Sequence, residues 1–302
     1  MVKYKTGIGE KVFKVFNVTV LFLFGLTTLY PFIYIIALSL NEGVDSMKGG
    51  IWLFPRKFTL FNYQYVLSNH LIQNAYIITI GRTVIGTLLS ISVTALVAYG
   101  LSYRNLPYKR GIMTFIIIPM VFNGGLIPYY LQLRALGLLN KFWVYIFPFS
   151  FSIFNMFVMR KFFMDIPESL NESAFIDGAT YLQTLYKIVL PLSKPMLAAL
   201  SLFTAVNQWN DWFSGAFYVS DLKLIPVQTY LQKILSADSL QMLTGDNRMV
   251  AEAAVRQGQY KEMTITAVKM SVVVIGTLPI LCVYPFLQKY FVKGMLVGAI
   301  KG

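Results

Sequence analysis

The segment from Asn207 to Trp212 places polar and aromatic side chains inside an otherwise apolar run, and reads Asn-Gln-Trp-Asn-Asp-Trp. Amides and a carboxylate are expensive to bury in lipid, so such groups normally face a water-filled path or another protein. Amides hydrogen-bond hydroxyl groups, and tryptophan offers a flat face to a sugar ring. An aromatic belt at the membrane interface is the alternative. We expect four residues to line a substrate pathway: Asn207, Trp209, Asn210 and Asp211.

A second irregular feature lies at Asn123 and Gly124, which Gly125 follows, within another apolar run. Adjacent glycines weaken a helix. Irregular backbone at membrane depth is tolerated where it lines a cavity. We therefore expect Asn123 and Gly124 to border the same pathway. Close helix packing at small residues is the alternative.

Ionisable residues are scarce in the apolar runs. Arg82 lies near one end of a run, where a long side chain can reach the lipid headgroups. We expect that arrangement, with pairing to an acidic sugar as the alternative. A multispan membrane transferase would need paired carboxylates, but only Asp211 qualifies. A self-sufficient secondary transporter would need inverted repeats and more ionisable groups. These two functions remain the alternatives to the one developed below.

The usual sequence signals of catalysis and metal binding are missing. No Gly-x4-Gly-Lys-Ser/Thr run is present, so the chain cannot hold ATP in that type of loop. The single histidine, His70, and the single cysteine, Cys282, have no partner with metal-ligand spacing. We therefore expect no enzymatic activity, no metal and no cofactor bound by this chain.

The polar loop that begins at Asp165 predicts two short helices joined at a glycine. Asp165 and Glu168 are three residues apart, as at a helix start. Gly178 favours a break, because glycine accepts the left-handed conformation that ends many helices. Thr180 and Gln183 predict a capping box for the second helix. An amphipathic loop helix resting on headgroups is the simplest alternative.

This loop, residues 165–191, resembles the EAA loop of permease subunits of ATP-binding-cassette (ABC) importers. The family pattern is Glu-Ala-Ala, three residues, Gly, nine residues, Ile-x-Leu-Pro, and here only the first Ala differs. In that family the loop is a coupling helix that docks into a separate ATPase subunit. The resemblance implies a coupling role for eight residues: Glu172, Ser173, Ala174, Gly178, Ala179, Ile188, Leu190 and Pro191.

The resemblance extends over nearly the whole chain, to the second permease subunit of maltose-type carbohydrate importers. The segment Phe122–Pro128, Phe-Asn-Gly-Gly-Leu-Ile-Pro, is similar to the lipo-oligosaccharide or aldouronate subgroup. It implies import of an oligosaccharide, with uronate-containing chains among the candidates. It also implies a second homologous permease as heterodimer partner, two ATPase subunits that use ATP and Mg, and an extracellular or periplasmic sugar-binding protein.

Composition indicates a polytopic membrane protein. Of 302 residues, 56% are hydrophobic and only 13% are charged, with a mean hydropathy of +0.61, whereas soluble domains carry about 25% charged residues. The net charge of +13 comes from basic residues dispersed among connecting segments rather than gathered in a stripe, so we expect membrane lipid and no nucleic acid as a partner.

A transmembrane helix needs about 20 apolar residues. We predict an all-α fold, a single permease domain over 1–302, of the type I importer class that the resemblance implies. Six helices are expected, at about 15–40, 78–103, 111–133, 142–160, 192–219 and 268–289.

Lysine and arginine distribution predicts the orientation. They are denser in the segments 1–14, 104–110, 160–191 and 289–302 than in the alternate connecting segments, 41–74, 134–141 and 220–268. Cytoplasmic loops are enriched in these residues. We therefore expect a multi-pass protein of the prokaryotic cell membrane with both termini in the cytoplasm.

Overall fold

The computed structural model describes residues 7–236, 264 and 266–282, and every regular element in those ranges is helical. The predicted all-α class is therefore confirmed. The chain divides into two units, Met1–Asn69 with Ile234–Thr277, and His70–Lys233 with Leu278–Gly302.

The first unit contains α1 (Ile8–Ser39), α2 (Gly43–Met47), α3 (Phe61–Ser68) and, up to Thr277, the apolar helix Thr266–Cys282. Most of α1 is apolar on all sides and exposed, and its buried residues gather at its last turn. A helix that is apolar all round needs lipid or protein about it. Its length and composition suit a membrane span.

The connection after α1 is held by near neighbours. Asp45 is 6% exposed, and its carboxylate accepts hydrogen bonds from Asn41 at 3.2 Å and Arg56 at 3.0 Å. Asn62 donates to the backbone oxygens of Ser39 and Asn41. These bonds fold the segment that follows α1 against the end of that helix.

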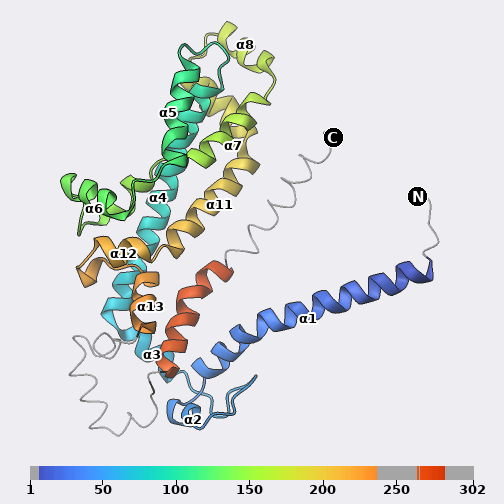
Figure 1. Ribbon diagram of the computed structural model, residues 1–302, viewed down its shortest axis with the longest axis vertical. Helices are drawn as coiled ribbons and strands as arrows, with labels where there is room; N and C mark the ends of the chain where they lie inside the picture. The colour runs from blue at the N-terminus through green and yellow to red at the C-terminus, as the bar shows by residue number, and fades with distance from the viewer. Residues whose placement is uncertain (1–6, 237–263, 265, 283–302) are drawn as a thin grey trace. The chain divides into compact units, whose positions relative to one another are not determined.

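In the second unit, α4 (His70–Ser102) packs against both α7 (Ile153–Met164) and α11 (Lys194–Asn210) (Figure 1). Small residues recur at every fourth position along its buried face: Gly86, Ser90, Thr94 and Ala98. Residues four apart share a helix face, and small side chains let helices approach closely. The sequence of α4 thus explains why two helices can pack on it.

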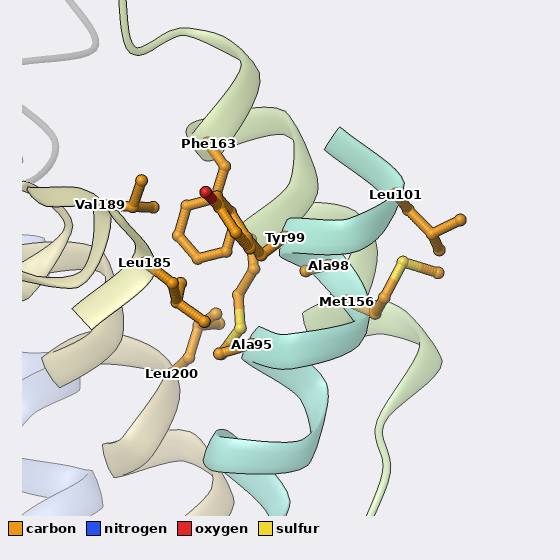
Figure 2. Packing of buried hydrophobic residues seen from close by; sticks show 10 residues of the cluster. Ala95, Ala98, Tyr99, Leu101, Met156, Phe163, Leu185, Val189 and Leu200 are labelled. Atoms are coloured by element: carbon orange, nitrogen blue, oxygen red, sulfur yellow. The ribbon is translucent and has the colours of Figure 1, made fainter. Parts of the chain in front are cut away.

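A buried apolar cluster fixes one end of this three-helix group. Figure 2 shows Tyr99 of α4 beside Phe163 of α7. Leu185, Val189 and Leu200, which come later in the chain, belong to the same cluster. All five residues are no more than 5% exposed. The cluster ties the 165–191 loop to the helices.

Three expected spans are bent or broken. Helix α5 (Lys109–Val121) and α6 (Leu126–Ala135) meet at 116°, and η1–η2 (Phe142–Phe149) meets α7 at 44°. The predicted runs 111–133 and 142–160 are therefore each built from two helical pieces, and the first break falls where Asn123 and Gly124 were expected to open the helix. At the first break Gly125 has a φ of +85°, and its N–H donates to the Asn123 side chain at 2.9 Å.

The predicted run 192–219 is also divided. Helix α11 ends at Asn210, and α12 (Phe213–Tyr218) begins after Asp211, whose backbone is extended. Beyond it lie η4 (Leu222–Leu224) and α13 (Val227–Leu235). The last part of the predicted 268–289 run lies outside the described residues.

Candidate functional sites: the 165–191 loop and a polar cavity

The 165–191 loop folds as two short helices joined at a glycine, as predicted. Helix α8 (Glu168–Ile176) is followed by α9 (Tyr181–Thr184), a π-helical turn η3 (Leu185–Val189) and α10 (Leu190–Leu192). The predicted capping box between Thr180 and Gln183 is present. The path then turns by 85° before α11.

Gly178 closes α8 in a left-handed conformation, with a φ of +82°. Its N–H donates to the Phe175 oxygen at 3.0 Å, and the Ala179 N–H donates to the Ala174 oxygen at 2.9 Å. These two bonds form a Schellman motif, which explains the glycine. A Cβ at this position would have no neighbour within 4 Å, so the requirement comes from the backbone and not from crowding.

The start of α8 differs from the prediction. Asp165 does not cap it, because the residue before α8 is Pro167 and makes no side-chain cap. Asp165 instead ends α7, where its carboxylate pairs with Lys161 at 2.7 Å. A lysine one turn earlier on a helix competes with helix capping for the carboxylate. The capping pattern takes no account of such a lysine.

The loop has an anchored face and an exposed face. Ala174 is 8% exposed, so it faces its own chain, whereas Ile176 is 86% exposed. Glu172 and Ser173 are exposed beside it. Ile176 was missed by the sequence analysis, although an apolar residue directly before Asp177 on a polar loop helix was the available signal. The exposed face of α8 is therefore Glu172, Ser173 and Ile176.

The later part of the loop is held by packing. Leu185 and Val189 are buried in the cluster of Figure 2, and Leu190 packs against its edge. Ile188 is half-buried and Pro191 is exposed. The Tyr181 ring stands edge-on to Tyr103, with ring centres 5.2 Å apart. The loop is thus connected to the end of α4 by aromatic and aliphatic contacts.

A cavity of about 650 Å³ lies among α4, α7 and α11. Its lining combines phenylalanine rings with small polar side chains. The aromatic and proline part is Pro148, Phe149, Phe151, Phe154 and Phe203, and the polar part is Ser90, Ser152, Asn155, Thr204, Asn207, Gln208 and Asp211. Such a surface can take a ligand with apolar faces and many hydroxyl groups.

Two of the predicted pathway residues, Asn207 and Asp211, line this cavity. They are four residues apart and share one side of the chain at the end of α11. Trp209 is not among the lining residues and stands edge-on to Tyr76, with ring centres 6.4 Å apart. Asn210 also lies outside the lining.

Asn123 and Gly124 are exposed at the break between α5 and α6 and are not among the cavity-lining residues. The expected opening of the helix is present at this point. A role for these two residues in the pathway stays a prediction.

Behind the cavity, Arg82 of α4 is fully buried. Its guanidinium donates to Asp211 Oδ2 at 2.6 Å and to the Asp211 backbone oxygen at 3.0 Å. It also lies 4.6 Å from the centre of the Tyr145 ring, within the range of a cation–π contact. The expectation that Arg82 reaches the headgroups is therefore wrong, because an ion pair inside the unit satisfies its charge.

Gln208 is a further residue that the sequence analysis left without a role. It is 4% exposed. Its amide donates to the Tyr145 backbone oxygen at 3.3 Å and its oxygen accepts from Arg82 at 3.4 Å. Gly86 makes room for it, since a Cβ there would lie 2.8 Å from the Gln208 amide nitrogen. Together, Arg82, Gln208 and Asp211 hold the broken end of α11 against α4.

Within the described part of the chain, no group of three or more His, Cys, Asp and Glu could hold a metal ion. The two sites are a loop helix with one anchored and one exposed face, and a cavity with polar and aromatic lining between apolar helices. These are the parts of a membrane permease.

Comparison with known proteins agrees. Residues 90–297 match the family described as binding-protein-dependent transport system inner membrane component. The protein LplC of Bacillus subtilis (strain 168) is 38% identical over 97% of this chain and 96% of its own. The polygalacturonan/rhamnogalacturonan transport system permease protein YtcP of the same organism is 38% identical over 93% of this chain and 96% of its own.

A solved structure is also similar. A chain of a bacterial ABC transporter involved in the import of the acidic polysaccharide alginate superimposes with a TM-score of 0.87 and 32% identity, over 96% of this chain and 100% of that one. The chain belongs to the family of inner membrane components of binding-protein-dependent transport systems. The predicted resemblance to carbohydrate ABC permeases is confirmed, and it sets aside the transferase and the secondary transporter.

Proposed function

We propose that this chain moves a carbohydrate across the cell membrane as one of two permeases in an ABC importer. The observation that carries the proposal is the 165–191 loop, whose α8 helix is anchored on one side and presents Glu172, Ser173 and Ile176 on the other. An exposed isoleucine on a polar helix fits an interface core with a polar rim.

The proposed energy source lies in partner subunits. Two ATPase subunits bind ATP and Mg, and one of them receives the α8 face. Closure of the ATPases on ATP then moves the loop, and the apolar cluster around Leu185 and Val189 carries that movement to α4 and α7. Coupling of this kind requires that ATP and sugar each prefer one of two states.

The proposed substrate is an oligosaccharide that passes the cavity lined by Asn207 and Asp211. Its amide, hydroxyl and aromatic lining suits sugar rings. The polygalacturonan and alginate in the names of two similar proteins favour a chain that contains uronates. A sugar-binding protein outside the cell delivers it, in keeping with a binding-protein-dependent family.

Six spans and cytoplasmic termini complete the proposal. Two helices are long and apolar enough to cross a membrane, and the α5–α6 pair, the η1–η2 and α7 pair, and α11 supply three more. The shorter helix Thr266–Cys282 would be the sixth. With both termini inside, the 165–191 loop lies on the ATPase side, as docking requires.

The first test is affinity purification of the chain from detergent-solubilised native membranes, with identification of the proteins that accompany it. We expect a second multispan permease and an ATPase, and the associated binding protein then gives the sugar by ligand binding. Recovery of the chain alone, stable and without an ATPase, would contradict the proposal.

The second test is Gly178→Asp, which forces a side chain and a charge into a left-handed position on the docking loop. We expect normal membrane insertion but at least about tenfold less ATPase in the purified complex. Gly49→Asp is a matched control, because Gly49 also has a positive φ, of +71°, and no neighbour within 4 Å. Equal ATPase recovery in both variants would refute the docking role of the loop.

A further inference from the structure

We infer that Asp211 makes this chain's wall of the cavity select sugar hydroxyl groups and repel sugar carboxylates. Arg82 is the positioning residue behind it. The inference rests on the proposed function, because it takes the cavity to lie on the path of the sugar. It concerns which chemical edge of the sugar faces this chain.

The charge of the lining is the first observation. Among the described residues that line the cavity, Asp211 carries the only charge, and the other polar groups are hydroxyls and amides. Uronate carboxylates are normally bound by arginine or lysine, which can form paired charge-assisted hydrogen bonds. This wall offers no such group among its lining residues.

The arrangement of the ion pair is the second observation. The Arg82 side chain is 0% exposed, whereas the Asp211 side chain is 19% exposed. A ligand in the cavity therefore meets the carboxylate and not the guanidinium. The pair presents its negative end to the cavity, so an approaching anion is repelled even though the pair is neutral as a whole.

A hydroxyl group meets the opposite situation. One Asp211 oxygen accepts from Arg82 and the other from the Ser214 backbone N–H at 3.1 Å. Each carboxylate oxygen can accept two hydrogen bonds. Unused acceptor positions therefore remain for a sugar hydroxyl, and the two bonds already made hold the carboxylate in place.

Uronate chains can still be substrates under this arrangement. Their carboxylates would have to point away from this wall, toward groups supplied by another subunit. The hydroxyl edge of the sugar would then contact Asn207 and Asp211. This chain would then discriminate between sugar groups by their charge, and it would not attract the uronate carboxylate.

The test uses the complete importer with its ATPase and binding protein in proteoliposomes. Uptake of two matched probes, trigalacturonate and galactotriose, is measured and expressed as the acidic-to-neutral ratio. Because every variant meets the same binding protein, the preference of that protein cancels in the comparison with the unmodified importer. The double variant Arg82→Gln/Asp211→Asn removes both charges together and so leaves no unpaired ion.

We expect the double variant to raise the acidic-to-neutral ratio about tenfold. Asn207 supplies an independent pair of variants, because it is exposed on the cavity wall and its replacement leaves the ion pair intact. Asn207→Lys should raise the ratio and Asn207→Asp should lower it. These two variants decide the question if the double variant fails to assemble.

An unchanged ratio in Asn207→Lys, Asn207→Asp and any assembled double variant would overturn the inference. Uptake of neither probe by the unmodified importer, in vesicles where it hydrolyses ATP, would instead refute the carbohydrate proposal. The two failures are therefore distinguishable.

Discussion

The 165–191 loop and the Arg82–Asp211 site hold their structures by contacts of very different range along the chain. In the loop, Thr180 bonds Gln183 and Ala179 bonds Ala174. At the cavity, Arg82 pairs with Asp211, 129 residues away. The loop is therefore specified by short sequence patterns that any reader can find. The cavity site depends on how α4 and α11 pack, and a single change there should affect two helices at once.

The largest expected effect comes from Arg82→Met, which removes the cation and leaves the Asp211 carboxylate without its partner. Breaking a buried ion pair on one side costs about 3–5 kcal/mol. We expect that loss in the free energy of unfolding, measured by denaturant unfolding in detergent.

The double variant Arg82→Gln/Asp211→Asn is the control, since it removes both charges. It should be clearly more stable than Arg82→Met. If Arg82→Met unfolds at the same denaturant concentration as the unmodified chain, the contact between α4 and α11 does not depend on the pair.

A smaller effect is expected for Gly86→Ala. The new Cβ would lie 2.8 Å from the Gln208 amide nitrogen, and overpacking of this kind costs about 1–3 kcal/mol. Gly100→Ala, in the same helix with no neighbour within 4 Å, should be neutral or stabilising. Thermal unfolding of the two variants side by side would show whether crowding at Gln208 matters.

Within the loop, Thr180→Ala removes one half of the capping box. We expect a local loss of about 1 kcal/mol, seen as faster hydrogen exchange of the Gln183 amide, with little change in global unfolding. Thr180→Ser keeps the hydroxyl and should exchange like the unmodified chain. If Thr180→Ala lowered the global free energy of unfolding as much as Arg82→Met does, the two regions would not differ in the range of their contacts as described.

The smallest effect concerns Asp45, whose partners lie within eleven residues along the chain. The hydrogen bond from Asn41 and the contacts with Arg56 lower its pKa, although burial opposes them. A lowered pKa stabilises the folded segment above the unfolded value of about 3.9. That contribution is lost as the pH falls through the lower folded pKa.

Limited proteolysis of the segment around Asp45 should therefore speed up below about pH 4. In Asp45→Asn, which cannot ionise, this acid dependence should be weaker. An identical pH profile in both chains would mean that another group controls the segment.

Sequence reasoning was most successful where the deciding contacts are local. Thr180 and Gln183 lie one helical turn apart, and Gly178 ends a helix by its own backbone, so both could be predicted. Asp165 failed because Lys161, also nearby, competes for it. The break at Asn123–Gly125 was expected from its glycines, but its angle of 116° was not. The break at Asp211 was not expected.

By itself, the sequence determined an all-helical membrane protein whose 165–191 loop forms two short helices joined at a glycine, because apolar runs, glycine positions and capping residues act over a few residues. Its likeness to permeases came from the resemblance of that loop to a known family. Only the tertiary structure decided that Arg82 turns inward to Asp211, that Ala174 faces its own chain, and that Asn207 and Asp211 share a cavity wall without Trp209 or Asn210. The physical reason is that burial and charge pairing depend on which helices meet. The small residues of α4 permit close approach, but they do not determine which helix packs against them.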